Sequence, residues 1–242
     1  MKTYKDIGFI IKIKQFPESD KLVVILGKKK GVIESVAKGA SKSTSKKVSS
    51  IDLLNLVTAT FYETKGIDLL KEIQLVKDFS TLKQNKIVVN KLLYILELID
   101  KISVLTDYEL NAFHLLENFM NLADVYPEHI DILLRVFELK LLKISGYAPE
   151  FYVYLDSNNK IQLKEKRVVS TGQGLGFVTN RHSKDNLISD KILKIQRYLT
   201  ENDMTLAVKM IITDEELKTL DSINRQWIGI VIEKRLKSHE LM

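Results

Sequence analysis

The sequence contains no cysteine and only four histidines, and these two absences remove several kinds of site. Without cysteine there is no disulfide, no thiolate nucleophile and no cysteine-ligated zinc or iron–sulfur cluster. The histidines lie too far apart in the sequence for two of them to share a helix face or a hairpin. They are His114, His129, His182 and His239. We therefore expect no metal site and no cofactor.

Long apolar runs are also missing. No stretch reaches the roughly 18 apolar residues of a membrane span, and charged side chains interrupt the first thirteen residues. We expect neither a transmembrane helix nor a signal peptide, and thus a cytoplasmic protein without a membrane partner. With 242 residues, 45% of them hydrophobic, the chain can build one large core or two to three small ones.

Positive charge is concentrated in one region. The net charge is +6, but residues 21–50 carry eight lysines against one acid, Glu34, which gives +7 there and leaves −1 for the rest. The lysines are Lys21, Lys28, Lys29, Lys30, Lys38, Lys42, Lys46 and Lys47. A focused basic region suits a polyanion, because lysines along a phosphate backbone release condensed counterions. Charge alone is equally compatible with a solvated turn followed by a polar loop.

The first eighty residues predict β-strands. Runs of β-branched and aromatic residues, several with period-two alternation, are separated by turn residues. The runs cover residues 6–14, 21–27, 31–39, 53–62 and 66–76. Five short strands at this spacing predict a small closed barrel of the OB type over residues 1–80.

Aromatic residues of this barrel divide into two groups. Phe9 and Phe61 alternate in phase with other apolar residues and are assigned to the core. Phe16 and Tyr62 are candidates for base stacking, because nucleic-acid-binding barrels stack bases on aromatic rings. Lys12 and Lys14, in the first strand, would extend the basic track.

From Gln84 onward the apolar period changes to three and four residues, which predicts amphipathic helices. The helices are expected over residues 87–102, 110–119, 132–141, about 189–200 and 214–238. Residues 151–180 depart from this period and predict one or two hairpins. We therefore expect an α+β fold, with the barrel followed by a helical domain at 81–242 that carries a β-hairpin insertion.

The last predicted helix combines an apolar stripe with cations. Trp227 lies on the stripe, and Lys234, Arg235 and Lys237 follow it. One interpretation is core packing beneath a charged outer face. The other is a groove for an acidic peptide with an apolar tip, since such a ligand needs an apolar pocket rimmed by cations.

Five motifs occur along the chain in one order. They are Glu18, Ser19 and Asp20 (ESD), Ala37 to Ala40 (AKGA), Tyr94 to Asp100 (YILELID), Phe137 to Pro149 (FELKLLKISGYAP) and Arg235 to Ser238 (RLKS). The AKGA element, followed by a basic loop with serines, is the most specific of them. In this order the motifs resemble RecO, a bacterial family of DNA-repair and recombination mediators, and the likeness extends from residue 7 to residue 238.

The resemblance implies a non-enzymatic function. Such a protein binds single- and double-stranded DNA, anneals complementary strands and, with RecR, helps RecA to replace single-strand-binding protein. RecA would be an indirect partner, and the C-terminal half would bind the acidic C-terminal tail of single-strand-binding protein. The protein would be associated with the nucleoid. The DNA-binding set would be Lys12, Lys14, Lys28, Lys29, Lys30, Lys38, Lys42, Lys46 and Lys47.

Two departures from the family pattern are visible. Many RecO proteins have a four-cysteine zinc ribbon after the Gly-x-x-Pro turn, where this chain has Tyr152, Tyr154 and Ser157, then Gly172 to Gly176. The zinc would be lost, and packing would hold the hairpins. The basic loop after AKGA, often arginine-rich in the family, carries lysine here. Lysine lacks the planar guanidinium fork, so contacts to the DNA backbone should survive better than contacts to bases.

Two other functions remain open. A helical adaptor whose basic barrel binds an acidic protein would show salt-sensitive protein binding and no retention of DNA. A nucleic-acid enzyme would need clustered acids for a metal, or a nucleophile with its base. Acidic pairs such as Glu215 and Glu216 lie at predicted helix starts, where the helix dipole favours them, so we expect no catalytic residue.

Overall fold

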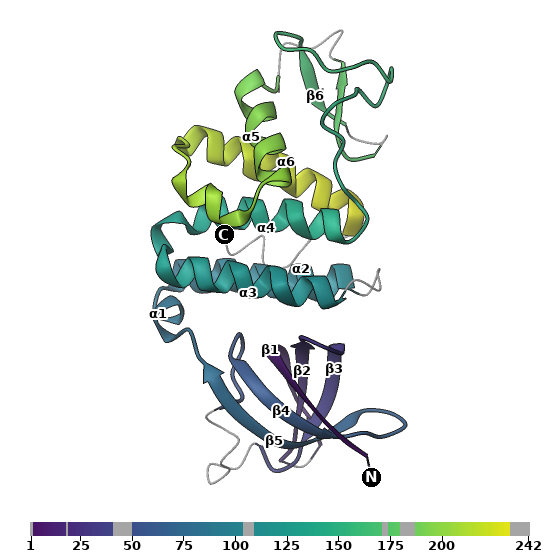
Figure 1. Cartoon of the computed structure of the whole chain (residues 1–242), viewed down its shortest axis with the longest axis vertical. Coiled ribbons are helices and arrows are strands. Elements are labelled where there is room, and N and C mark those ends of the chain that lie inside the picture. Colours follow the sequence, from purple (N-terminus) through teal and green to yellow (C-terminus); the bar gives the residue numbers. More distant parts are fainter. Residues whose placement is uncertain are drawn as a thin grey trace. The chain divides into compact units, whose positions relative to one another are not determined.

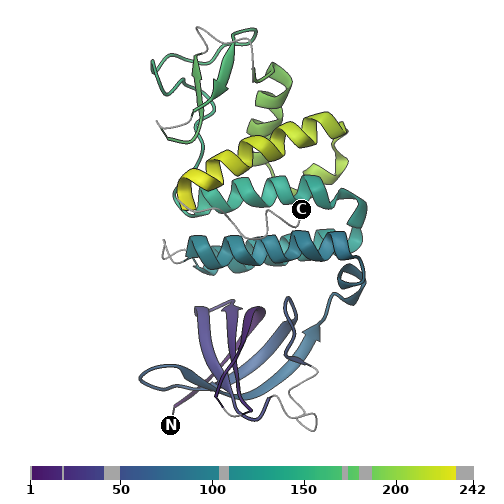
Figure 2. The ribbon, with the colours of Figure 1, turned by 180° about the vertical axis from the view of Figure 1, so that it is seen from behind.

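The structure is a computed structural model that describes residues 2–17, 19–40, 50–103, 109–170, 174–179 and 187–232. The chain forms two compact units, one of residues 1–103 with 107–117, the other of residues 104–106 with 118–242. Figures 1 and 2 follow the chain by colour from the N-terminal strands to the last helix. None of the helices in the described ranges is long and apolar enough to cross a membrane.

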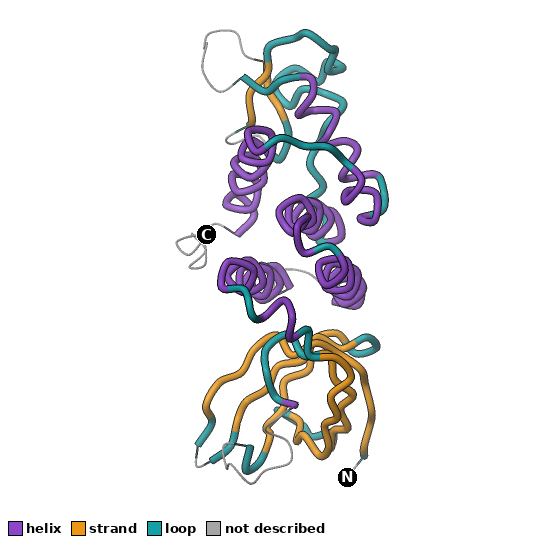
Figure 3. Tube along the Cα trace, turned by 90° about the vertical axis from the view of Figure 1, so that its left-hand side faces the viewer, coloured by secondary structure: helices purple, strands orange, loops and turns teal. Residues whose placement is uncertain are grey.

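The first unit contains a five-stranded closed barrel with the strand order β1-β2-β3-β5-β4, seen as the orange strands at one end of Figure 3. The strands are β1 (Thr3–Gln15), β2 (Lys21–Gly27), β3 (Gly31–Ala37), β4 (Leu56–Tyr62) and β5 (Asp68–Lys77). The N-terminal half of β1 pairs with β4 and its C-terminal half with β2. Only β3 and β5 run parallel. The predicted α+β class, with an OB-like barrel before the helices, is confirmed.

Strand β1 changes partners around Gly8, which pairs with both Gly27 of β2 and Val57 of β4 and comes very close to β2. A Cβ atom at this position would stand 2.5 Å from both Ile25 Cγ2 and the carbonyl oxygen of Leu26. Contacts that short do not occur between real side chains and backbone, so only glycine fits. The side chain of the next residue, Phe9, lies outside the inner core of the barrel.

The barrel has an inner core and a covered outer face. The inner core includes Val23, Ile25 and Phe61. Phe9, next to the core residue Ile10, instead lies 6.1 Å from the ring of Phe79 and 5.6 Å from the ring of Phe113. Phe9 and Phe61 are both fully buried, so their predicted core role is confirmed.

Helices follow the barrel at the predicted places. They are α1 (Ser80–Lys83), α2 (Lys86–Ser103), α3 (Glu109–Val125), α4 (Ile130–Ile144), α5 (Asp190–Glu201) and α6 (Asp214–Ile232), with short 3-10 turns at Pro127–His129 and Met204–Lys209. The period-based prediction missed α1 and the second 3-10 turn, which are too short to show a period. The predicted last helix ran to residue 238, of which the part beyond 232 lies outside the described residues.

Helix α4 forms the centre of the second unit and packs against α5 and α6. Eleven of its fifteen residues are buried, including Arg135 and Glu138. The chain enters α4 through the 3-10 turn that begins at Pro127 and leaves it at Gly146, whose φ of 82° is in the left-handed region. This agrees with the proline and glycine signals of the sequence.

A hairpin segment separates α4 from α5. Its strands β6 (Arg167–Val169) and β7 (Phe177–Thr179) pair antiparallel, which confirms the predicted hairpin, and a tight loop is closed by a bridge between Val153 and Lys160. Within this segment, Lys164 has a φ of 69°, and strand β6 begins only at Arg167. The N–H of Lys164 donates to the carboxylate of Asp190 instead of to a neighbouring strand.

Candidate nucleic-acid interface

The β2–β3 hairpin divides the lysine cluster into two groups. Its register runs from Lys21 opposite Ala37 at the open end to Gly27 opposite Gly31 at the turn. Six steps of about 3.4 Å separate these ends by about 20 Å. We call Lys28, Lys29 and Lys30 the turn lysines. We call Lys14, Lys21 and Lys38 the open-end lysines, since Lys14 pairs with Leu22 at the same end.

The backbone of the turn is fixed by one buried carboxylate. Asp6, only 4% exposed, accepts hydrogen bonds through Oδ2 from the backbone N–H of Lys29 at 3.1 Å and of Lys30 at 3.0 Å. Its Oδ1 accepts from the N–H of Ile7 at 2.8 Å. The protein itself therefore supplies hydrogen bonds that stabilise the backbone of this turn.

Two of the three turn lysines direct their ammonium groups at protein partners. Lys30 Nζ lies 4.1 Å from the ring centroid of Tyr4 and 3.6 Å from Glu63 Oε1. Lys28 Nζ lies 5.6 Å from the ring centroid of Phe113. Burial, together with a hydrogen bond donated to Asp68, raises the pKa of Tyr4 well above its usual value, so its phenol stays protonated. A phosphate approaching this turn would compete with these contacts.

Lys12 is also engaged inside the first unit. Its Nζ is 2.7 and 2.8 Å from the two carboxylate oxygens of Asp100 on α2. Lys14, two residues further along β1, is exposed and makes no ion pair with any described residue. Both lysines were assigned to the basic track in the sequence analysis. In the structure they differ, because the ammonium group of Lys12 is already paired with Asp100.

The open end is shaped by the AKGA element. Ala37 and Ala40 are fully buried in the barrel core, whereas Lys38 between them is exposed. Gly39 has a φ of 66°, and its N–H donates to Asp20 Oδ1 at 2.7 Å. Asp20 belongs to the β1–β2 loop, so this hydrogen bond joins that loop to the end of β3. Lys42, Lys46 and Lys47 follow directly and lie outside the described residues.

Only one of the two candidates for base stacking, Phe16, lies in the loop at this end, whereas Tyr62 pairs with Thr3 of β1 and precedes Glu63, the partner of the turn lysine Lys30. Phe16 is half-buried in the β1–β2 loop, where its N–H donates to the carbonyl oxygen of Asp20 at 3.1 Å. Tyr62, also half-buried, pairs with Leu69 of β5 and has Lys71 Nζ 5.5 Å from its ring centroid. Both rings retain exposed surface.

The predicted peptide groove is not assembled around Trp227. This side chain has no exposed surface and packs edge-on against Phe151 and Phe177, with ring centroids 5.7 Å away in each case. A fully buried indole cannot contact a bound peptide, so Trp227 is a core residue. The cations Lys234, Arg235 and Lys237 lie outside the described residues, and for them the groove stays a prediction.

Sequence reasoning missed the carboxylates that organise the barrel. Asp6 and Asp20 fix the two ends of the β2–β3 hairpin, and Asp100 takes up Lys12. A single acid in an apolar strand gives no local sign of its partner. Asp20 alone had a signal, because it is the last residue of the ESD motif, directly before the predicted strand at 21–27.

Comparison with known proteins covers the whole chain. Residues 1–79 match the family described as Recombination protein O N terminal, and residues 92–240 match Recombination protein O C terminal. A DNA repair protein RecO of Clostridium perfringens is 31% identical over 243 residues, which cover 97% of this chain and 95% of that protein. The DNA repair protein RecO of Symbiobacterium thermophilum is 25% identical over 247 residues, which cover 100% and 97%.

Proposed function

This chain belongs to the RecO family of DNA repair proteins, and on that premise we propose that it binds single- and double-stranded DNA at the open end of its barrel. The observation that supports this site is the contrast between the two lysine groups. Two of the three turn lysines, Lys28 and Lys30, contact protein partners, whereas Lys14 and Lys38 are exposed and lack an ion pair among the described residues. Lys38 leads directly into the lysines of residues 41–49.

The chemistry of the site suits the backbone of DNA rather than its bases. OB barrels bind oligonucleotides through strands β2 and β3 and the adjoining loops, which is where the open end lies. Lysine acts as a point charge on phosphate and does not read base edges as an arginine fork does. Phe16 and Tyr62 would stack bases of a single strand. Binding should therefore depend strongly on salt and little on sequence.

The mediator activities follow from this binding. Neutralising phosphates on two strands lowers the repulsion between them, which favours annealing of complementary strands. We further propose that the protein acts with RecR and with the acidic tail of single-strand-binding protein, and thereby helps RecA to assemble on DNA. These steps require binding and no bond-making residue, so the proposed function is non-enzymatic.

The test is a titration of fluorescent single-stranded DNA at several salt concentrations. Replacing Lys38, Lys42, Lys46 and Lys47 together by alanine should weaken binding and flatten the slope of log affinity against log salt by about 0.7 to 0.9 for each phosphate that is no longer neutralised. The matched variant replaces Lys28, Lys29 and Lys30 by alanine and should leave most of the slope in place. An unchanged slope in the first variant would refute the assignment.

The alternatives give different outcomes in the same assay. An adaptor for an acidic protein would bind a peptide with an acidic, Phe-ended tail and retain no DNA at any salt concentration. A nuclease would cleave labelled DNA in the presence of Mg²⁺. Within the described ranges, no group of three or more histidine, aspartate or glutamate side chains is placed to hold a metal.

A further inference from the structure

The segment between α4 and α5 does not have the ligands of the zinc ribbon found in many RecO proteins. Zinc is held by cysteine, histidine or carboxylate, and the positions in question carry Tyr152, Tyr154 and Ser157. The Tyr152 hydroxyl donates to Glu201, and that of Tyr154 donates to Glu165 at 2.9 Å. The hydrogen bond to Glu201 raises the pKa of Tyr152, and burial raises that of Tyr154, so both remain protonated. These residues do not fit zinc.

We propose that a buried arginine, Arg167, takes the structural place of the metal and holds this segment on helix α5. We call residues 150–179 the ribbon segment, of which 171–173 lie outside the described residues. The expectation from the sequence was that packing would hold its hairpins. The polar contacts revise that expectation.

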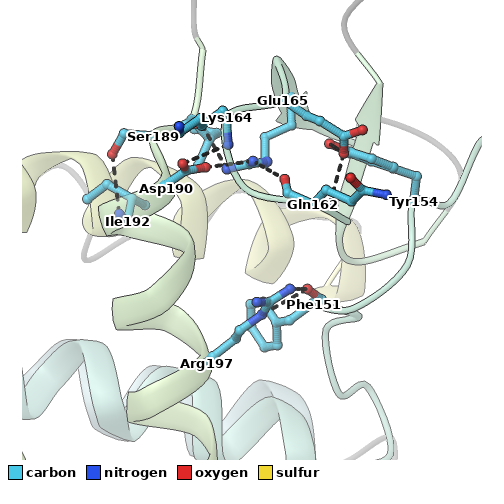
Figure 4. A network of polar contacts seen from close by, with 11 residues as sticks. Phe151, Tyr154, Gln162, Lys164, Glu165, Ser189, Asp190, Ile192 and Arg197 are labelled. Atoms are coloured by element: carbon cyan, nitrogen blue, oxygen red, sulfur yellow. Dashed lines mark hydrogen bonds and ion pairs between the residues drawn. The ribbon is translucent and has the colours of Figure 1, made fainter. Parts of the chain in front are cut away.

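Arg167 lies on β6 and has no exposed surface. Its Nη2 donates to the carbonyl oxygen of Gln162 and to Asp190 Oδ1, each at 2.8 Å, and its Nη1 lies 3.5 Å from the carbonyl oxygen of Ile188. The guanidinium therefore gathers acceptors from a loop of the ribbon segment, from the chain that enters α5 and from the first turn of α5. Figure 4 shows Gln162, Lys164 and Asp190 within one network of polar contacts.

The loop that carries Gln162 is closed by carboxylates. Glu165 Oε2 accepts the hydroxyl of Tyr154 and the backbone N–H of Gln162, each at 2.9 Å. Asp190 Oδ2 accepts the N–H of Lys164 at 2.8 Å, while its other oxygen binds Arg167. Glu165 thus links two parts of the ribbon segment, and Asp190 links the loop to α5 (Figure 4).

A second arginine holds the start of the ribbon segment. Arg197 lies seven residues after Asp190 on α5, which places both on one face of the helix. Its Nε and Nη2 donate to the carbonyl oxygen of Phe151 at 3.1 and 2.6 Å, and its guanidinium carbon is 4.5 Å from the ring centroid of Tyr152. Helix α5 therefore holds the ribbon segment at two places, with a carboxylate at one and a guanidinium at the other.

A guanidinium can replace a metal in this role for a physical reason. Its N–H donors point outward in a rigid plane, so one group can bind acceptors from several segments, as zinc binds ligands from two loops. A buried cation is tolerated only with a counter-charge, which Asp190 supplies. Unlike thiolates on zinc, these contacts do not respond to chelators or to oxidation of sulfur.

The experiment compares Arg167→Met with Lys166→Met in the full chain. Both variants remove one positive charge, but Lys166 is exposed and adjacent. In Arg167→Met, amide hydrogen exchange in residues 150–170 should accelerate by about a hundredfold or more, because a buried ion pair is broken. Exchange in the barrel should not change. The single tryptophan, Trp227, packs on Phe151 and Phe177, so its emission should shift to longer wavelength.

Two further measurements test the contact between Arg167 and Asp190. If Arg167→Met does not fold, Asp190→Asn retains the arginine without its counter-charge and should accelerate exchange in the same residues by about tenfold. The wild-type protein should unfold at the same temperature with EDTA as with added Zn²⁺. Equal exchange in the Arg167→Met and Lys166→Met variants would overturn the proposal, as would a lower unfolding temperature in EDTA. Neither result would affect the DNA-binding assignment.

Discussion

The two units of this protein use positive charge in opposite ways. In the barrel the cations are lysines, and Lys14 and Lys38 at its open end are exposed; the sequence has no arginine before residue 135. In the second unit Arg135 and Arg167 are only 4% and 0% exposed. Lysine loses strong hydration when buried, whereas arginine is weakly hydrated and satisfies several acceptors at once. A charge count along the sequence therefore finds clusters of exposed cations and misses single buried ones.

The largest effect is expected at the buried ion pair between Arg135 and Glu138. Arg135 Nη1 lies 3.2 Å from Glu138 Oε2 and also pairs with Asp221. Glu138 has no exposed surface, and it accepts a hydrogen bond from Asn224 Nδ2 at 2.8 Å. Glu138→Ala leaves a buried guanidinium short of its counter-charge and should lower the free energy of unfolding by about 3 to 5 kcal/mol. Denaturant unfolding of the purified protein measures this.

The control for that prediction is Glu128→Ala, which removes a glutamate whose side chain is 64% exposed. It should change the free energy of unfolding by less than about 0.5 kcal/mol. Glu138→Gln keeps an acceptor for Asn224, so its effect on the free energy of unfolding should lie between those of Glu138→Ala and Glu128→Ala. If Glu138→Ala lowered the free energy of unfolding no more than Glu128→Ala does, buried Arg135 would not depend on its carboxylate partner. The contrast between the two units would then not hold.

A medium effect is expected in acid, at the contact between Arg167 and Asp190. The hydrogen bond from Arg167, followed by that from the N–H of Lys164, lowers the pKa of Asp190 below its ordinary value of 3.8. A depressed carboxyl pKa contributes stability that is complete above the ordinary value and is lost as the pH falls through the lower, folded value. Trp227 emission should therefore report opening of the ribbon segment below pH 3.8.

Asp190→Asn separates this group from other carboxyls of the second unit whose pKa values are also lowered, namely Asp203 and Glu216. The variant should show a weaker ribbon contact at neutral pH and a flatter acid response of Trp227 emission. Parallel acid curves for the variant and the wild-type protein would show that Asp190 is not the titrating group.

Much of the barrel could be predicted from the sequence, because alternation and turn residues are local signals. Gly27 and Gly31 delimit the β2–β3 turn, and the strands on either side were placed correctly. The partners of the lysines could not be predicted, since Lys12 pairs with Asp100 and Lys30 with Glu63, which lie far from them in the sequence. In the run Lys164, Lys166 and Arg167, only the last is buried, and nothing in their spacing marks it. Burial of a charge is decided by long-range partners such as Asp190.

The smallest effect is expected for single lysines of the barrel, and it can be tested with Lys12 and Lys14 of strand β1. Lys14→Ala should flatten the salt dependence of DNA binding by about 0.7 to 0.9, the value for one neutralised phosphate. Lys12→Ala should leave that slope unchanged, because its ammonium group is already 2.7 Å from Asp100, and should lower stability by at most about 1 kcal/mol. The measurement is the same titration of single-stranded DNA against salt. Equal flattening in both variants would mean that DNA displaces Asp100 from Lys12. Pairing within the protein would then not decide which lysines of the barrel bind DNA, and the turn lysines would have to be counted again as part of the site.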